Sequence, residues 1–152
     1  MRALIFVIAL LAPSLALAAN SVTLSSAVFL EKTIADSSGH ARIVLEEPQS
    51  VTPGDQLVFI LNYRNAGNAP ASDFIVTNPL PAAVAYSGSR DSAQVSIDGG
   101  RSWGTLLALK VRESDGRWRN AMPEDVTHVR WALKHTIAAG AQGKLSFRGV
   151  VR

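Results

Sequence analysis

The residues of this sequence best suited to bind another molecule are Arg117, Trp118 and Arg119. They lie in a polar, turn-rich interval from Glu113 to Asp125, where we expect a long loop with a hairpin around Asp115-Gly116. An indole between two guanidinium groups suits contact with a protein partner or with the face of a sugar. The alternative is an aromatic side chain that folds back over the end of a sheet, and the sequence favours neither.

A second pattern with chemical associations is Ser96-x-Asp98-x-Gly100-x-x-Trp103. It matches the short Asp-box found in the blades of sialidase-like propellers, where the Asp carboxylate accepts backbone N–H groups across a turn and the Trp packs beneath. A propeller needs several copies of such a unit, and this chain has one. We therefore interpret the pattern as a structural hairpin rather than the remnant of a glycosidase.

The sequence shows no set of residues typical of a catalytic or metal site. It contains neither Gly-x-Ser-x-Gly nor His-Glu-x-x-His, and its lack of cysteine excludes thiol chemistry and cysteine-based metal sites. His128 and His135 are seven residues apart, which places them on opposite faces of a regular strand. Acidic loop residues could join in a calcium site, although no Asp-x-Asp-x-Asp run supports one; they are Asp73, Asp91, Asp98 and Asp125. We predict no enzyme, no cofactor and no metal.

The charge of the chain argues against a nucleic-acid partner. Lys and Arg number 15 and Asp and Glu number 12, which gives a formal net charge of +3. Apart from Arg112, Arg117 and Arg119 the basic residues are scattered, whereas a nucleic-acid interface needs a concentrated basic patch.

Residues 1–18 have the pattern of a cleavable signal peptide. Arg2 supplies the positive charge, Leu4 to Leu11 is an apolar run, and Ala16-Leu17-Ala18 fits the rule of small residues before the cleavage site. The run is too short for a membrane helix and is followed by Pro13. We expect an exported protein, periplasmic or extracellular, with no membrane span once the signal is removed.

The stretch from Val51 to Pro81 predicts two strands in succession. Pro53-Gly54-Asp55 forms a turn, and the next segment alternates with a period of two, with its large apolar residues on one face: Leu57, Phe59, Leu61 and Tyr63. We expect a turn at residues 65–68 in which Gly67 or Asn68 takes a positive φ. A second strand through residues 74–76 ends at Pro79.

The rest of the chain also reads as strands and turns, which predicts an all-β, antiparallel β-sandwich with little or no helix. Residues 19–30 are expected to be an N-terminal arm or an edge strand, with a slip in register near Ser25-Ser26. The further predicted strands are residues 42–46, 84–86, 95–97, 106–111, 129–133 and 145–151.

These motifs together resemble a family of bacterial and archaeal cell-surface proteins, the conserved repeat domain of unknown function that is number eleven in its series. The matching residues are Pro53, Gly54, Asp55, Tyr63, Asn65, Gly67, Asn68, Ala69, Pro79, Leu80 and Pro81. Asn78 departs from the pattern, because the family most often has Asp there. The resemblance covers residues 31–152 and implies an immunoglobulin-like sandwich, but it implies little about molecular function.

We therefore expect an exported, non-catalytic module of the cell envelope with a structural or protein-interaction role. Its partner would be an envelope or surface protein, bound through loops and sheet edges of a rigid scaffold. The alternative is a carbohydrate-binding module that holds a polysaccharide on Trp118.

Overall fold

The computed structural model describes residues 22–152, so the predicted signal peptide at residues 1–18 lies outside the described residues. The described chain is all-β and antiparallel, as predicted, and has no α-helix. Within this range, no helix has the length and apolar character that crossing a bilayer requires. The strands are β1 (Val22–Ala35), β2 (Ala41–Glu46), β3 (Gln56–Asn65), β4 (Ile75–Pro79), β5 (Val84–Ser89), β6 (Gln94–Ser96), β7 (Lys110–Arg112), β8 (Trp118–Asn120), β9 (His128–Ala132) and β10 (Gln142–Val151), with two 3-10 turns, η1 (Leu106–Ala108) and η2 (Pro123–Asp125).

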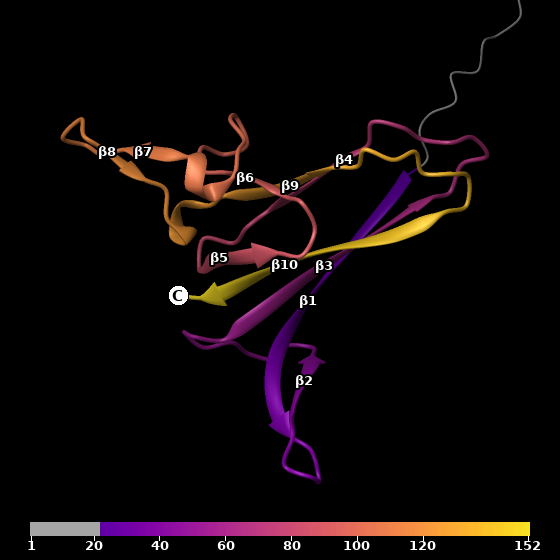
Figure 1. The fold of residues 1–152 in the computed structure, drawn as a ribbon, viewed down its shortest axis with the longest axis horizontal. Helices are drawn as coiled ribbons and strands as arrows, with labels where there is room; N and C mark the ends of the chain where they lie inside the picture. Colours follow the sequence, from indigo (N-terminus) through magenta and orange to yellow (C-terminus); the bar gives the residue numbers. More distant parts are fainter. Residues whose placement is uncertain (1–21) are drawn as a thin grey trace, which may run out of the picture.

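The strands form three sheets (Figure 1). The largest has five strands in the order β2-β1-β3-β10-β5, and a second has three in the order β4-β9-β6. The third is the two-stranded hairpin of β7 and β8. Every pair of strands is antiparallel.

The alternation predicted for β3 is confirmed and makes this strand the centre of the large sheet. β3 pairs with β1 along one side and with β10 along the other. Leu57, Phe59 and Leu61 are buried on one face, which we call the inner face. Val58 on the opposite, outer face is buried as well, which explains why that face of the strand is also apolar.

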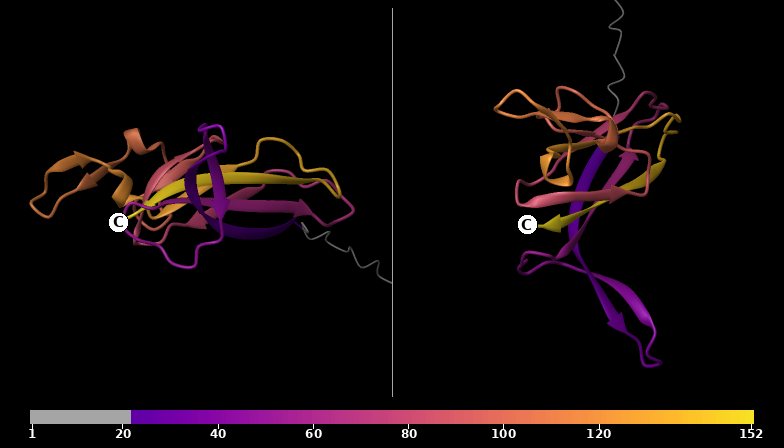
Figure 2. Two further views of the ribbon diagram at one scale, coloured as in Figure 1. Left: turned by 90° about the horizontal axis from the view of Figure 1, so that it is seen from below. Right: turned by 60° about the vertical axis from the view of Figure 1, so that its left-hand side comes forward.

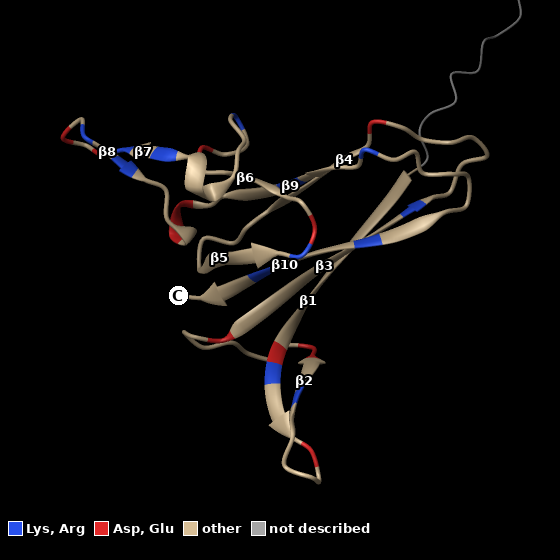
Figure 3. Cartoon of the chain, in the orientation of Figure 1, with Lys and Arg blue, Asp and Glu red and all other residues tan. Residues whose placement is uncertain are grey.

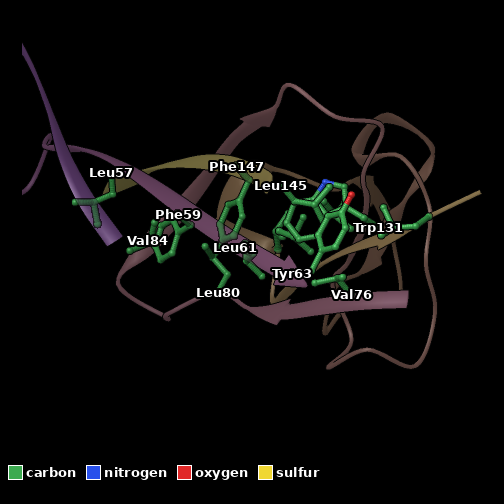
Figure 4. Close-up of a cluster of buried hydrophobic side chains, with 14 of the residues drawn as sticks. Leu57, Phe59, Leu61, Tyr63, Val76, Leu80, Val84, Trp131, Leu145 and Phe147 are labelled. Carbon is green, nitrogen blue, oxygen red and sulfur yellow. The ribbon is translucent and has the colours of Figure 1, made fainter. Parts of the chain in front are cut away.

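One aromatic side chain of β10 joins the two larger sheets (Figure 4). Phe147 is 1% exposed and stacks on Phe59 of β3, with ring centroids 4.4 Å apart and planes inclined by 4°. Its ring centroid also lies 5.9 Å from that of Trp131, which β9 contributes from the three-stranded sheet. All three residues are buried, and their contacts place both sheets on one shared core.

Two glycines of β10 leave room for bulky neighbours on the inner face. A Cβ atom at Gly143 would lie 2.2 Å from the Tyr63 hydroxyl oxygen, and one at Gly149 would lie 2.3 Å from Cγ1 of Val84. No side chain fits at either position, so glycine lets Tyr63 lie across one end of the strand and lets Val84 approach the other.

The turn after β3 is closed by a buried side chain rather than by a left-handed residue. Asn65 donates from Nδ2 to the carbonyl oxygens of Ala69 and Ile137, at 2.8 and 2.9 Å, and its Oδ1 accepts from Gly67 N at 3.0 Å. The expectation of a positive φ at Gly67 or Asn68 is wrong, because the positive φ in this connection is that of Asp73, at 54°. The three hydrogen bonds of Asn65 hold this turn in shape, so no residue with a positive φ is needed at positions 67 or 68.

The N-terminal strand is longer and more regular than expected. β1 pairs with β3 from Val22 to Glu31 without interruption, so the slip in register expected near Ser25-Ser26 is absent. The predicted boundary between residues 30 and 31 falls inside this strand. From Leu30 to Ala35 it pairs on its other side with β2, and the two strands project from the body as a hairpin (Figures 1 and 2).

The predicted strand over residues 106–111 is also wrong in part. Leu106–Ala108 is a 3-10 turn, and only Lys110–Arg112 is a strand. Leu106 and Leu109 pack partly against the core, while Leu107 between them is 93% exposed. Contacts three residues apart fit a 3-10 turn rather than the two-residue period of a strand.

We predict that Phe147→Ala lowers the free energy of unfolding by about 3–5 kcal/mol, because it removes the ring that fills the space between both sheets. Urea unfolding followed by far-UV circular dichroism measures the change. The matched control is Phe74→Ala, the same truncation at a residue that packs against the edge of the core, for which we expect a clearly smaller loss. Equal losses for the two variants would contradict the central role of Phe147.

Candidate functional site

The three predicted binding residues lie on a hairpin that projects from the body of the molecule (Figures 1 and 2). β7 and β8 pair with the register Lys110↔Asn120, Val111↔Arg119 and Arg112↔Trp118. The turn between them contains Gly116 with a φ of 86°, and the backbone N–H of Glu113 donates to the carbonyl oxygen of Arg117 at 2.8 Å. The hairpin predicted around Asp115-Gly116 is therefore confirmed.

Arg119 fixes the hairpin to the 3-10 turn η2. Its Nη1 and Nη2 atoms donate to the two carboxylate oxygens of Asp125, at 2.5 and 2.7 Å, and its Nε atom donates to Oε1 of Glu113 at 2.5 Å. Asp125 also accepts a bond from the backbone N–H of Met122 at 2.7 Å. The bidentate bond from Arg119 holds the pKa of Asp125 below its usual range, so both groups stay charged over the working pH range.

Trp118 is the exposed aromatic residue of this hairpin, with 64% of its surface accessible. Strand alternation places it on the face opposite Arg119 and on the same face as Arg112, its cross-strand partner. The guanidinium carbon of Arg112 lies 5.9 Å from the centre of the indole ring, within the range of a cation–π contact. One side of the ring is thus supported by a cation while much of the ring faces solvent.

Arg117 lies at the end of the turn and is strongly exposed. Its Nε donates to Oδ2 of Asp115 at 2.7 Å. A hollow of about 400 Å³ is lined by Glu113 and by the three predicted residues Arg117, Trp118 and Arg119. The structure therefore brings the three together around one concave surface, with the charge of both arginines balanced by neighbouring carboxylates.

This arrangement presents groups that can bind another molecule. The hairpin offers a flat apolar ring, a cation beside it, and polar groups at Lys110 and Asn120 on the same face. The carboxylates of Glu113 and Asp125 are bonded to Arg119, and that of Asp115 is bonded to Arg117. An indole so placed can stack on a sugar ring or insert into an apolar pocket of a protein partner.

The Asp-box residues form the structural hairpin that the sequence predicts. Oδ1 of Asp98 accepts from the Ser96 hydroxyl and from the backbone N–H groups of Arg101 and Ser102, at 2.7, 3.0 and 2.9 Å. Its Oδ2 accepts from the Ser102 hydroxyl at 2.6 Å. Ser102 and Ser96 hold the pKa of Asp98 well below its usual range. The ring of Trp103 lies under Gly100, and Arg130 stacks on it with its guanidinium carbon 4.3 Å from the ring centre.

The remaining polar candidates are dispersed. Nδ1 of His128 contacts the Thr127 hydroxyl at 3.1 Å, and Nε2 of His135 lies 3.5 Å from the Tyr63 hydroxyl. Among residues 22–152, no three His, Asp or Glu side chains come together in a way that could hold a metal ion. The acidic residues considered for calcium are in separate places, with Asp98 in its own turn and Asp125 on Arg119.

Arg112 is a member of the site that the sequence did not predict. A two-residue turn at Asp115-Gly116 would bring residue 112 opposite residue 119, whereas the observed loop of residues 114–116 brings it opposite Trp118. Leu107 and Met122, both exposed, flank the hairpin along the chain and were also missed. Because Ala121 N donates to Leu109 O at 2.9 Å, the two segments that carry them meet at the base of the hairpin.

We predict that Arg119→Gln loosens the hairpin, because it removes the bidentate bond to Asp125 and the bond to Glu113. The backbone amides of Trp118, Arg119 and Asn120 should then exchange with deuterium several-fold faster than in the wild type. Arg117→Gln is the matched control, since Arg117 contacts only Asp115 within its own turn. Unchanged exchange in Arg119→Gln would mean that other contacts hold the hairpin in place.

We also predict that Asp98→Asn lowers the melting temperature at neutral pH. A lowered pKa in the folded state means that Asp98 stabilises the fold above the unfolded-state pKa of about 3.9, and that this contribution is lost as the pH falls below it. The difference between wild type and variant should therefore narrow from about pH 5 down to about pH 2. Thermal melts across this pH range measure the difference in melting temperature, and Asp73→Asn is the control. A difference between wild type and Asp98→Asn that stays constant with pH would contradict the prediction.

Comparison with known proteins identifies no relative of this chain. No protein-family model matches it, and neither the curated proteins nor the solved structures contain a significant match. The resemblance to the cell-surface repeat family therefore stays a prediction. What the structure shows is an antiparallel all-β domain built from several sheets.

Proposed function

We propose that this protein is an exported, non-catalytic interaction module of the cell envelope, which presents binding elements from a rigid β-scaffold. Its partner would be an envelope or surface protein. In this proposal the five-stranded and three-stranded sheets, which share one core, correspond to the immunoglobulin-like sandwich of the cell-surface repeat family. The exported location is supported by the signal-peptide pattern of residues 1–18.

The observation that carries the proposal is the exposed ring of Trp118 on an anchored, projecting hairpin. Exposed tryptophans that are held in a fixed position are typical of the residues that contribute most to binding energy at protein interfaces. Trp118 is held by Arg112 on its own face and, through Arg119, by Asp125. Because these bonds exist in the free protein, little conformational entropy is lost when the ring binds.

Apolar residues next to the hairpin enlarge the surface. Leu107 in η1 and Met122 just after β8 are both exposed, and their segments meet at the base of the hairpin. Methionine adapts to the shape of an apolar partner surface, and tryptophan, methionine and arginine are all enriched at protein interfaces. These residues favour a protein partner with an apolar pocket.

A carbohydrate ligand is the second candidate function, and it rests on the polar groups around the same ring. Lys110, Arg112 and Asn120 lie on the face of Trp118 and can donate hydrogen bonds to sugar hydroxyls while the indole covers a sugar ring. The hollow beside it, about 400 Å³, lies within the size range of small-molecule sites.

We predict that Trp118→Ala abolishes most partner capture, because it removes the exposed ring and leaves the anchoring bonds of Arg119 in place. The experiment is a crosslinking pull-down from fractionated cell envelopes, with wild type and variant at equal amounts, read by mass spectrometry. The expected result is a protein partner that is enriched by the wild type and depleted at least about ten-fold by the variant.

The matched control is Ile75→Ala, which truncates another exposed apolar residue on a different part of the surface and should leave capture unchanged. Titration of intrinsic fluorescence with envelope polysaccharides separates the second candidate. A response that Trp118→Ala removes would favour carbohydrate, whereas equal capture of proteins by wild type and Trp118→Ala would overturn the assignment of this surface.

A further inference from the structure

One edge of the large sheet is left open by the part of the chain that the structure describes. β1 pairs with β3 along one side from Val22 to Glu31, but β2 covers its other side only from Leu30 onward. Over residues 22–29 no described strand lies on that second side. Alternate residues there point their backbone N–H and C=O groups away from β3, where another extended chain can bond to them.

This open edge lacks the features that usually protect an edge strand. Residues 22–30 contain no Lys, Arg, Asp, Glu, Pro or Gly, and the first charge along β1 is that of Glu31 (Figure 3). The ladder with β3 shows no bulge. Natural proteins place charges, prolines or bulges at such edges to prevent pairing with another chain. Their absence indicates that pairing is tolerated or required.

The apolar side chains beside the edge are also uncovered. Leu24 and Val28 lie opposite Tyr63 and Phe59 and so project to the inner face, yet they are 46% and 36% exposed. Val22 and Leu30 of β1 pack partly against the shared core, whereas Leu24 and Val28 between them stay exposed. A chain that adds to this edge would bury apolar surface as well as backbone groups.

We infer that two copies of this chain pair through the open edges of β1, antiparallel, with Ser26 on the two-fold axis. The partner must be an extended, uncharged segment with apolar residues on its inner face, and β1 itself has these properties. Antiparallel pairing is the one arrangement that satisfies both open edges with a single two-fold axis, which stands perpendicular to the sheet. The inference rests on β1 alone and is independent of the Trp118 hairpin.

The register follows from symmetry and from β2. Across the axis each residue faces one on the same side of the sheet, so the sum of the two residue numbers is even. Pairing Leu24 with Val28 of the second copy joins the exposed apolar residues and places Ser26 opposite Ser26 of the second copy. Because β2 occupies the same side from Leu30, the ladder is limited to residues 23–29, a length of about 24 Å. An interface of this length is small, so the dimer should dissociate on dilution.

The test uses charge at the axis. Ser26 is exposed, so Ser26→Lys and Ser26→Glu are compatible with the monomer fold. In each variant two like charges would face each other across the axis, which should weaken dimerisation at least about ten-fold. An equimolar mixture of the two variants should dimerise again, because a lysine then faces a glutamate. Sedimentation equilibrium from about 1 to about 200 µM, which spans the expected weak affinity, measures each state.

The matched control is Thr33→Lys, which places the same charge on the exposed part of β1 that β2 already pairs, and should leave the dimer unchanged. Thermal melts verify that each variant is folded. A wild type that is monomeric at every concentration, a Ser26→Lys variant that dimerises like the wild type, or a mixture that stays monomeric would each overturn the inference. None of these results depends on whether Trp118 binds a partner.

Discussion

The contact between Phe147 and Trp131 is the constraint on which the rest of the molecule depends. It is the aromatic contact between the five-stranded and the three-stranded sheet, and Phe59 supports it from beneath. Trp131 lies on β9, which follows directly after η2, and η2 carries the Asp125 carboxylate that binds Arg119. A short, rigid path therefore leads from the core to the projecting hairpin, so the position of the exposed ring is set by packing in the interior.

Outside the core, hydrogen bonds from single polar side chains hold the turns in shape, as backbone hydrogen bonds hold the strands in the sheets. Asn65 bonds to three backbone groups after β3, and Asp98 organises the turn after β6 with four bonds. Arg119 uses all three of its donor nitrogens. Each of these residues nearly exhausts its capacity for hydrogen bonds, which leaves the loops ordered without a disulfide.

The sequence predicted the fold where the signal was local. The two-residue alternation of β3, the glycine-containing turns and the Asp-box are each readable within ten residues, and the structure has all of them. It could not predict what covers an apolar residue, because that depends on distant segments. Residues 106–108 look like a strand but form a 3-10 turn in which Leu107 is exposed, and Leu24 and Val28 of β1 are exposed although they lie in a long apolar strand. Trp118 could be predicted as a binding residue because an aromatic side chain in a polar interval is visible in the sequence alone. Its neighbour Arg112 could be placed beside it only once the register of the hairpin was known.

The order of strands in the large sheet has a consequence for how the molecule acquires its structure. β3 lies between β1 and β10, so its two neighbours come from opposite ends of the described chain. As the polypeptide emerges from the ribosome, β1, β2 and β3 can meet early, but Phe59 has no ring to stack on until Phe147 is made. Non-local pairing of this kind delays completion of the large sheet until β10 has been made, because the long loop between β3 and β10 must close before their contacts can form. Until then the edge of β3 that β10 covers in the folded protein has no partner strand.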